Sequence, residues 1–237
     1  MEVDLNELEK QEQSPHSSTF QSFFESQYTK QIEKLAMEWP QKKSLFVDFH
    51  DLEHYSFELA DELLESPDVL IEAAQQAVQN IHVPTLETQE FKPHIRFYNL
   101  PKDRIPLLRN VGAEHLGTLI SIEGVVRQLT DVLPKLKVAS WQCRRCGNVY
   151  KREQETDKIS VPPMCECKHR DFELLPHKST FIDNQKIQVQ EPLELLKGSE
   201  QATILNIIVG DDLVNKVMPG DRTKITGVIR LKTPKDK

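Results

Sequence analysis

Apolar residues in the first part of the chain recur at helical spacing. From Phe20 onward they follow one another in steps of three and four, which places them on one face of a helix. That face consists of Phe20, Phe24, Tyr28, Ile32, Leu35 and Trp39. Ser17 and Ser18 are favourable N-cap residues and Pro40 interrupts helical hydrogen bonding, so we expect one helix between these limits.

Two more helices are predicted before residue 90. The first stops before Pro67, and its apolar positions are Leu59, Leu63 and Leu64. The second ends before Pro84, and its apolar positions are Leu70, Ala74, Ala77, Val78 and Ile81. The run SLFVDF, from Ser44 to Phe49, is rich in β-forming residues and is compatible with a strand or an extended segment. Residues 1–90 are therefore expected to form a small helical bundle.

The pattern changes after Phe91, where short β-type runs are separated by turn residues. The runs are HIRFYNLP, TLISIEGVVRQL, KLKVASWQC, FELLPHKSTFID, KIQVQE, ATILNIIVGDDLV and TKITGVIRLK. The last run alternates, so that Ile225, Gly227, Ile229 and Leu231 are expected on one face and Lys224, Thr226, Val228, Arg230 and Lys232 on the other. Five or more short strands with long, unequal connections favour a small closed barrel such as an OB-fold.

Composition and charge add two points to this picture. The 237 residues are 38% hydrophobic and 28% charged, no apolar run approaches the ~20 residues of a membrane span, and the first residues are acidic. We therefore expect an intracellular protein. Residues 1–90 hold 5 Lys and Arg against 19 Asp and Glu, whereas residues 91–237 hold 25 against 18. The acidic part suits a solvated surface, while the basic part indicates a polyanionic partner.

All four cysteines lie in one stretch, WQCRRCGNVYKREQETDKISVPPMCECKHRDF, which starts at Trp141. Two pairs of this kind in a reducing compartment are more typical of metal ligands than of disulfides or incidental buried thiols. We expect zinc, with Cys143, Cys146, Cys165 and Cys167 as ligands. His169 is the leading alternative fourth ligand and His177 a remoter one. Ligation by protein alone leaves no position for water, which favours a structural ion.

The second pair is spaced C-x-C, one residue shorter than a usual zinc knuckle. Residues two apart on a straight strand lie about 6.6 Å from each other. Sulfurs on one tetrahedral zinc lie about 3.8 Å apart. Cys165 and Cys167 must therefore lie on a bend, which Pro162 and Pro163 make plausible.

Motifs that would indicate catalysis are missing from the sequence. There is no G-x-x-x-x-G-K-[ST] phosphate loop, no G-x-S-x-G and no H-E-x-x-H. Once zinc occupies the thiols, no nucleophilic Cys/His pair remains. The chain by itself is not expected to be an enzyme.

The order of these parts resembles the N-terminal region of the minichromosome maintenance (MCM) proteins, the replicative helicases of archaea and eukaryotes. The resemblance covers nearly the whole chain from about Ser44 and looks like the single-subunit archaeal form. It is carried by SLFVDFHDL, HIRFYNLP, LGTLISIEGVVRQLTDVLPKLKVASWQCRRCG, FIDNQKIQVQEP and GDDLVNKVMPGDRTKITGVI. The expected fold is α+β, a helical bundle followed by an OB-fold barrel with an inserted zinc-binding β subdomain.

The resemblance also implies a domain plan. It comprises a helical bundle over 1–90, the first part of the barrel over 91–139, a zinc subdomain over 140–176 and the rest of the barrel over 177–237, with a channel hairpin at about 190–203. An ATPase motor that uses ATP and Mg²⁺ would lie beyond Lys237, so the full-length protein is expected to be an ATP-dependent DNA helicase.

The assembly implied by the resemblance is a homo-hexameric ring, or a double hexamer, that encircles single- or double-stranded DNA. Other replication-initiation proteins are the expected further partners. The expected location is cytoplasmic, associated with the nucleoid, without membrane contact.

The resemblance assigns DNA contacts to Arg127, with Lys135 and Lys137 beside it, and to Lys197 near the hairpin tip. The family usually has Gly-x-x-Pro-Arg in this hairpin, whereas this chain reads GSEQAT over residues 198–203. Gln185 falls in a stretch that the family uses as a communicating loop, so an intersubunit role is expected for it.

Two other functions fit the same residues. A zinc-ribbon and OB adaptor would bind proteins through its acidic helical half and would not need Arg127 for binding. An RNA-binding OB/zinc factor would prefer single-stranded RNA over DNA of the same sequence.

Overall fold

The structure is a computed structural model that describes residues 2–3, 15–81, 91–154, 159–196 and 201–231. These residues divide into two units. The helix–sheet unit contains the described residues of 15–129, 187–207 and 217–231. The arm unit contains those of 2–3, 130–186 and 208–216. None of the described helices is long and apolar enough to cross a membrane.

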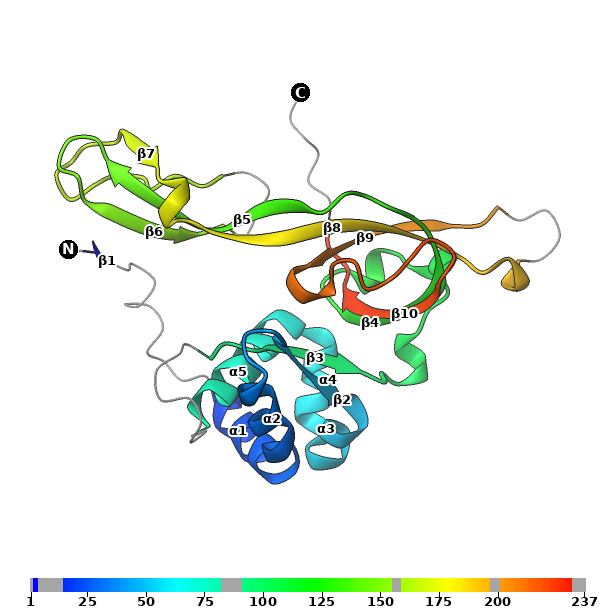
Figure 1. The fold of residues 1–237 in the computed structure, drawn as a ribbon. Helices are drawn as coiled ribbons and strands as arrows, with labels where there is room; N and C mark the ends of the chain where they lie inside the picture. The colour runs from blue at the N-terminus through cyan, green and yellow to red at the C-terminus, as the bar shows by residue number, and fades with distance from the viewer. Residues whose placement is uncertain (1, 4–14, 82–90, 155–158, 197–200, 232–237) are drawn as a thin grey trace. The chain divides into compact units, whose positions relative to one another are not determined.

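The first predicted helix is two helices in the structure, α1 (Pro15–Gln27) and α2 (Thr29–Met37) (Figure 1). The expectation of one helix capped at Ser17 or Ser18 is therefore wrong at its start and in its middle. The break lies at Tyr28, whose hydroxyl donates to Asp51 Oδ2 at 2.7 Å and accepts from the Asp48 N–H at 2.9 Å. Tyr28 is thus held by a segment distant in sequence.

The remaining helices are α3 (Phe49–Tyr55), α4 (Phe57–Glu65) and α5 (Pro67–Asn80). Helices α4 and α5 confirm the two predicted from their leucine and alanine spacing, whereas α3 is too short to leave a periodic signal. The Asp48 side chain caps α3 by accepting from the His50 N–H, and the Ser56 hydroxyl caps α4 by accepting from the Leu59 N–H.

A two-stranded parallel sheet accompanies the helices. Strand β2 (Ser44–Asp48) confirms the predicted strand, and its partner is β3 (His94–Tyr98). Because β3 follows residue 90, the helical part of the chain includes a strand from beyond the first ninety residues. The buried side chains of α1–α5, β2 and β3 form one apolar core, which Leu119 and Val228 of the following sheet also enter.

The OB-like sheet of this unit is built on β4 (Leu119–Leu129). Strand β10 (Arg222–Val228) pairs with it antiparallel on one side, and the second half of β8 (Thr180–Gln190) pairs antiparallel on the other. Strand β9 (Ile204–Gly210) also pairs with β8. The predicted faces of the last run are wrong in part, because Val228 packs on the helical core while Leu231 is 78% exposed.

The arm unit is organised around β5 (Leu133–Cys143). It pairs antiparallel with β6 (Val149–Glu153), with β7 (Phe172–Leu174) and with the first half of β8. A short parallel strand, β1 (Glu2–Val3), pairs with β6. The predicted run FELLPHKSTFID is therefore not one strand: a 3₁₀ turn over Pro176–Lys178 divides it between β7 and β8.

Candidate metal centre and nucleic-acid groove

The first cysteine pair lies on the turn between β5 and β6. Cys143 is the last residue of β5, and its backbone N–H donates to the Asn148 carbonyl at 2.9 Å. The Gly147 N–H donates back to the Cys143 carbonyl at 2.9 Å. Gly147 has φ +78°, a conformation that glycine adopts without strain. This turn directs Cys143 inward, where it is 1% exposed, and leaves Cys146 at the surface.

The second pair lies on a tight turn, as the C-x-C spacing requires. The Lys168 N–H donates to the Cys165 carbonyl at 2.8 Å, and the Cys165 N–H donates to the His169 carbonyl at 2.9 Å. Lys168 adopts φ +62°, in the left-handed region. The chain therefore reverses within four residues, which brings Cys165 and Cys167 to one side.

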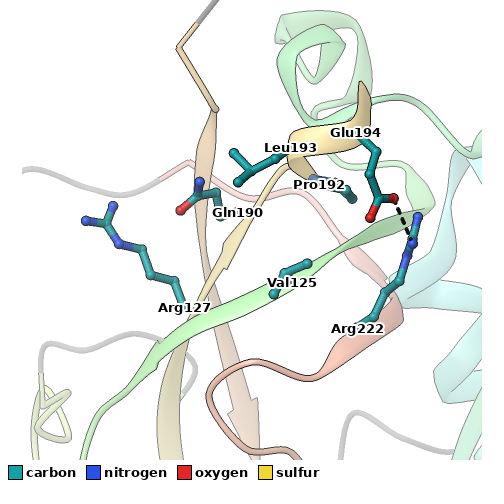
Figure 2. A pocket seen from close by; sticks show the side chains of 7 residues that line it. All are labelled: Val125, Arg127, Gln190, Pro192, Leu193, Glu194 and Arg222. Atoms are coloured by element: carbon teal, nitrogen blue, oxygen red, sulfur yellow. Dashed lines mark hydrogen bonds and ion pairs between the residues drawn. The ribbon is translucent and has the colours of Figure 1, made fainter. Parts of the chain in front are cut away.

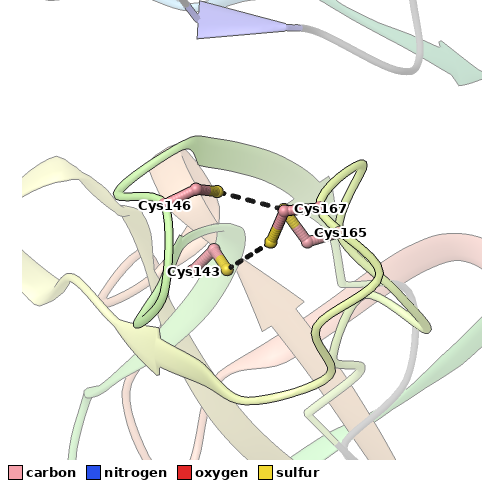
Figure 3. Close-up of side chains that lie close together, drawn as sticks. All are labelled: Cys143, Cys146, Cys165 and Cys167. Atoms are coloured by element: carbon pink, nitrogen blue, oxygen red, sulfur yellow. Dashed lines mark hydrogen bonds between the residues drawn. The ribbon is translucent and has the colours of Figure 1, made fainter.

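The four thiols meet at one point (Figure 3). Cys143 Sγ lies 3.6 Å from Cys167 Sγ, Cys146 Sγ lies 3.3 Å from Cys165 Sγ, and all four sulfurs lie within 4.8 Å of one another. Sulfurs around one tetrahedral zinc are separated by about 3.8 Å. The donor set thus fits one soft, tetrahedral metal ion without help from His169. These four are the one such group found among the described residues.

The thiols influence one another's ionisation. A hydrogen bond with the Tyr150 hydroxyl lowers the pKa of Cys165 to about 6, although burial acts in the opposite direction. At Cys146 the Asn148 N–H favours the thiolate, but the adjacent thiols and burial together outweigh it and raise the pKa to about 12. Burial, followed by the Cys165 thiol, raises the pKa of Cys167. Neighbouring thiols therefore resist joint ionisation, and a bound cation would remove that resistance.

A groove lies in the helix–sheet unit, on the face of the OB-like sheet that carries Val125, Gln190 and Arg222. We call it the β4 groove; it has a volume of about 490 Å³. Its lining residues are Val125, Arg127, Gln190, Pro192, Leu193, Glu194 and Arg222 (Figure 2). Val125 stands opposite Gln190 of β8 and opposite Arg222 of β10, and directly opposed residues in antiparallel strands share a face. Strand pairing therefore sets these three side chains in one row.

Arg127 lies next to this row at an irregularity of β4. The register with β8 shifts between Val126 and Gln128, which leaves Arg127 as the bulged residue. Bulges turn a side chain away from the regular alternation of a strand. Within the described parts of the chain, the Arg127 side chain has no hydrogen-bonding or ion-pairing partner, and Figure 2 shows its guanidinium directed away from Glu194.

Arg222 carries the second positive charge of the groove, and Glu194 opposes it. Arg222 Nη1 lies 3.0 Å from Glu194 Oε2, and both side chains are more than half exposed. An exposed pair of this kind contributes between 0 and about 1 kcal/mol. A stronger anion can therefore displace Glu194 from Arg222 at little cost.

The segment that carries Glu194 is fixed at its base by Arg109. This arginine donates to the Leu195 carbonyl at 2.7 Å, and its Nε lies 3.1 Å from Oε1 of Glu191, which is 1% exposed. That contact is an ion pair without hydrogen-bond geometry, since neither carboxylate oxygen of Glu191 has a hydrogen-bond partner. The Glu191 N–H donates to the Thr203 carbonyl at 3.0 Å, which joins the two ends of the segment.

The other predicted site residues fall in different places. Lys135 and Lys137 lie on β5 of the arm unit, where Lys135 is half-buried and has a partner within the chain, and Lys137 is exposed. They are not part of the β4 groove. Lys197 lies outside the described residues.

Gln185 lies inside strand β8, so its expected place in a loop is wrong. Its amide nitrogen donates to the Thr130 carbonyl at 3.0 Å and to Asn215 Oδ1 at 3.2 Å, and its amide oxygen accepts from the Asn215 N–H at 2.9 Å. The side chain is 3% exposed and joins three segments of the arm unit. Its intersubunit role stays a prediction.

Among the residues on which the arguments about these sites depend, sequence reasoning did not find Glu194, Arg222 or Tyr150. Arg222 follows Asp221 in the PGDR turn, and nothing local distinguishes it from a surface arginine; only its pairing opposite Val125 places it in the groove. Tyr150 has one signal in the sequence, an aromatic residue close after the C-x-x-C pair and directly before the charged run Lys151, Arg152 and Glu153.

Comparison with known proteins gives two family matches. The model of the MCM N-terminal domain matches residues 17–103, and that of the MCM OB domain matches residues 106–233, more than half of the chain. A crystal structure of the N-terminal domain of an archaeal MCM has a TM-score of 0.79 at 30% identity, and the match covers 94% of this chain and 91% of that one. The helices followed by an OB-like sheet are thus the MCM N-terminal fold.

Individual relatives agree with these matches. The minichromosome maintenance protein MCM of Saccharolobus solfataricus is 30% identical over 202 residues, which cover 81% of this chain and 29% of the relative. The probable DNA helicase MCM8 of Arabidopsis thaliana is 29% identical over 194 residues, covering 78% of this chain and 24% of the relative. The chain thus spans less than a third of the length of these relatives. It belongs to the MCM family, and its two matched parts are the MCM N-terminal domain and the MCM OB domain.

Proposed function

We propose that this chain is the non-catalytic, DNA-binding and ring-assembly region of a replicative DNA helicase. The observation that carries the proposal is the β4 groove, in which strand pairing brings two exposed arginines to one face of the OB-like sheet. None of its seven lining residues is aromatic, so the groove has cations for phosphates but no stacking surface for bases. Binding through it is therefore independent of base sequence.

The rest of the assembly follows from family membership and is part of the same proposal. The chain would form a homo-hexamer or double hexamer around single- or double-stranded DNA, with other replication-initiation proteins as partners, in the cytoplasm at the nucleoid. ATP and Mg²⁺ would act in a motor domain of the full-length helicase. Electron microscopy of the zinc-loaded chain, with and without forked DNA, tests ring formation. A monomer under every zinc-replete condition contradicts it.

The metal in the cysteine cluster is proposed to be Zn²⁺ in a structural role. Support comes from the fit of four sulfurs to a tetrahedral site, since four protein ligands leave no position for water or substrate. Cys143 and Cys146 of the β5–β6 turn and Cys165 and Cys167 of the C-x-C turn would hold the ion, so that its binding would link the two turns. The subdomain it would brace corresponds to the expected range 140–176, between the two parts of the barrel.

The groove predicts a specific loss of affinity. A double variant, Arg127→Ala with Arg222→Ala, is expected to bind single-stranded DNA at least tenfold more weakly. The plot of log K against log salt concentration should also become less steep, its slope decreasing in magnitude by about 1.4, because two phosphate contacts are lost. Fluorescence anisotropy with a mixed-sequence oligonucleotide at several salt concentrations measures both.

The matched control is Lys30→Ala with Lys34→Ala, which removes the same charge from exposed positions of α2. Its affinity should stay near that of the wild type. Equal losses in the two variants would indicate a non-specific charge effect. No DNA affinity in the wild type would favour the protein-binding adaptor, and preferential competition by single-stranded RNA of the same sequence would favour the RNA-binding factor.

Glu194 predicts the opposite effect in the same groove. Glu194→Gln removes the carboxylate that lies 3.0 Å from Arg222, so that guanidinium becomes available to phosphate. We expect DNA affinity to rise about two- to fivefold, in keeping with the small free energy of an exposed ion pair. The same anisotropy titration measures it. Unchanged or weaker binding would mean that Glu194 does not compete with DNA for Arg222.

A further inference from the structure

Tyr150 lies on β6, packs against the cysteine cluster and is 3% exposed. Its ring meets Phe172 edge to face, with ring centroids 5.9 Å apart and an interplanar angle of 85°. Tyr150 and Phe172 pack with Cys143, Cys165 and Cys167 in a small apolar cluster separate from the helical core. A buried tyrosine hydroxyl requires a hydrogen-bonding partner, and two of the partners of Tyr150 belong to the C-x-C turn.

The hydroxyl makes two contacts with successive residues of that turn. The Glu166 N–H donates to Tyr150 Oη at 3.3 Å, and Cys165 Sγ lies 3.2 Å from the same oxygen. A backbone N–H can only donate, so the oxygen accepts from Glu166 and its own hydrogen is free to point at sulfur. A metal-bound Cys165 is a thiolate, which can only accept. These two conditions fix the direction as O–H to S.

We propose that Tyr150 is an outer-shell positioning residue of the metal centre, which donates a hydrogen bond to the Cys165 thiolate and holds the middle residue of the C-x-C turn. This inference rests on the zinc site proposed above. It has two consequences. The hydrogen bond withdraws charge from the sulfur, which makes Cys165 less nucleophilic, and the contact with Glu166 keeps the short turn in the shape that lets two cysteines share one ion.

Tyr150→Phe tests the hydrogen bond, because it keeps the ring on Phe172 and removes only the hydroxyl. Loss of an outer-shell partner typically lowers metal affinity 10- to 100-fold. We expect zinc affinity, measured by competition with a chromogenic chelator, to fall about tenfold. In the cobalt-substituted protein the sulfur-to-cobalt charge-transfer bands should move to longer wavelength. N-ethylmaleimide should modify Cys165 faster, as mapped by mass spectrometry.

Tyr98→Phe is the control, since it removes a hydroxyl from a tyrosine of β3 that is 47% exposed. It should match the wild type in every measurement. If Tyr150→Phe does not fold, the hydrogen bond can still be tested in the wild-type protein. With ¹¹³Cd bound, the Tyr150 hydroxyl proton should exchange slowly and show a scalar coupling to the metal through the hydrogen bond.

The two proposals fail differently. A wild-type chain that binds no zinc removes the metal site and the role of Tyr150 with it. A wild-type chain that binds zinc, together with a Tyr150→Phe variant of unchanged affinity and cobalt spectrum, leaves the metal site intact and reduces Tyr150 to a packing residue. Absence of the hydroxyl coupling in the cadmium-loaded wild type also rejects the hydrogen bond.

Discussion

Replacing Cys165 by serine is expected to lower zinc affinity about a hundredfold and to unfold the part of the arm unit around the cysteines, the described residues of 143–174. Binding of a structural zinc provides roughly 10–16 kcal/mol, so each of four thiolates accounts for on the order of 3 kcal/mol. Around the cysteine cluster the candidate ligands are also part of the core, because Cys143 and Cys165 are buried there together with Tyr150. Without the ion, little apolar surface remains to hold the C-x-C turn against β6.

Loss of order should be confined to the arm. The helical core contains none of the cysteines and packs around α1–α5, so it should remain folded. Elemental analysis of zinc per chain after dialysis against a chelator measures the first effect. Hydrogen exchange measures the second, with protection lost across the described residues of 143–174 and kept in α1–α5.

His169→Ala is the informative control for this substitution. His169 contributes its backbone carbonyl to the turn and is outside the group of four sulfurs, so the variant should keep one zinc per chain. If His169→Ala loses zinc while Cys167→Ser keeps it, the fourth ligand is the histidine. Full zinc retention by Cys165→Ser would reject the four-cysteine site.

The approach of the cysteines within each pair could be predicted from the sequence because their spacing is local. Each pair of cysteines is joined by one or two residues, so the spacing itself limits the distance between the sulfurs, and the need for a bend at the C-x-C pair follows from strand geometry. The bend is a turn closed by Lys168 in a left-handed conformation. The role of Tyr150 in the cysteine cluster could not be predicted, because its contact with Cys165 depends on how the C-x-C turn packs against β6.

The groove could not be predicted in the same way. Arg127 belongs to β4 and Arg222 to β10, and they share a face because Arg127 follows Val125 by two residues and the register places Arg222 opposite Val125. Periodicity within one strand carries no information about the strand beside it. The break at Tyr28 has the same origin, since the helical spacing continues through it and the hydrogen bonds to Asp48 and Asp51 come from tertiary structure.

Gly124 lies in the middle of β4, directly before Val125 of the β4 groove. A Cβ added there would lie 2.3 Å from Val189 Cγ1 and 2.8 Å from the Gln190 carbonyl oxygen. Val189 is 0% exposed and β-branched, so its methyl group has little room to move, and the carbonyl belongs to the β8 backbone. Glycine at this position is therefore required by the close approach of β8 to β4.

Gly124→Ala is expected to destabilise the helix–sheet unit by about 2 kcal/mol, within the range for overpacking a buried site. The melting temperature should fall by about 4–8 °C. Gly227→Ala on the neighbouring β10 is the matched control, because nothing lies within 4 Å of its added Cβ, and its stability should be unchanged or slightly higher. Calorimetry of both zinc-loaded variants measures the difference. Equal melting temperatures would show that β8 can withdraw from β4, and the row of Gln190, Val125 and Arg222 would then not be rigidly fixed.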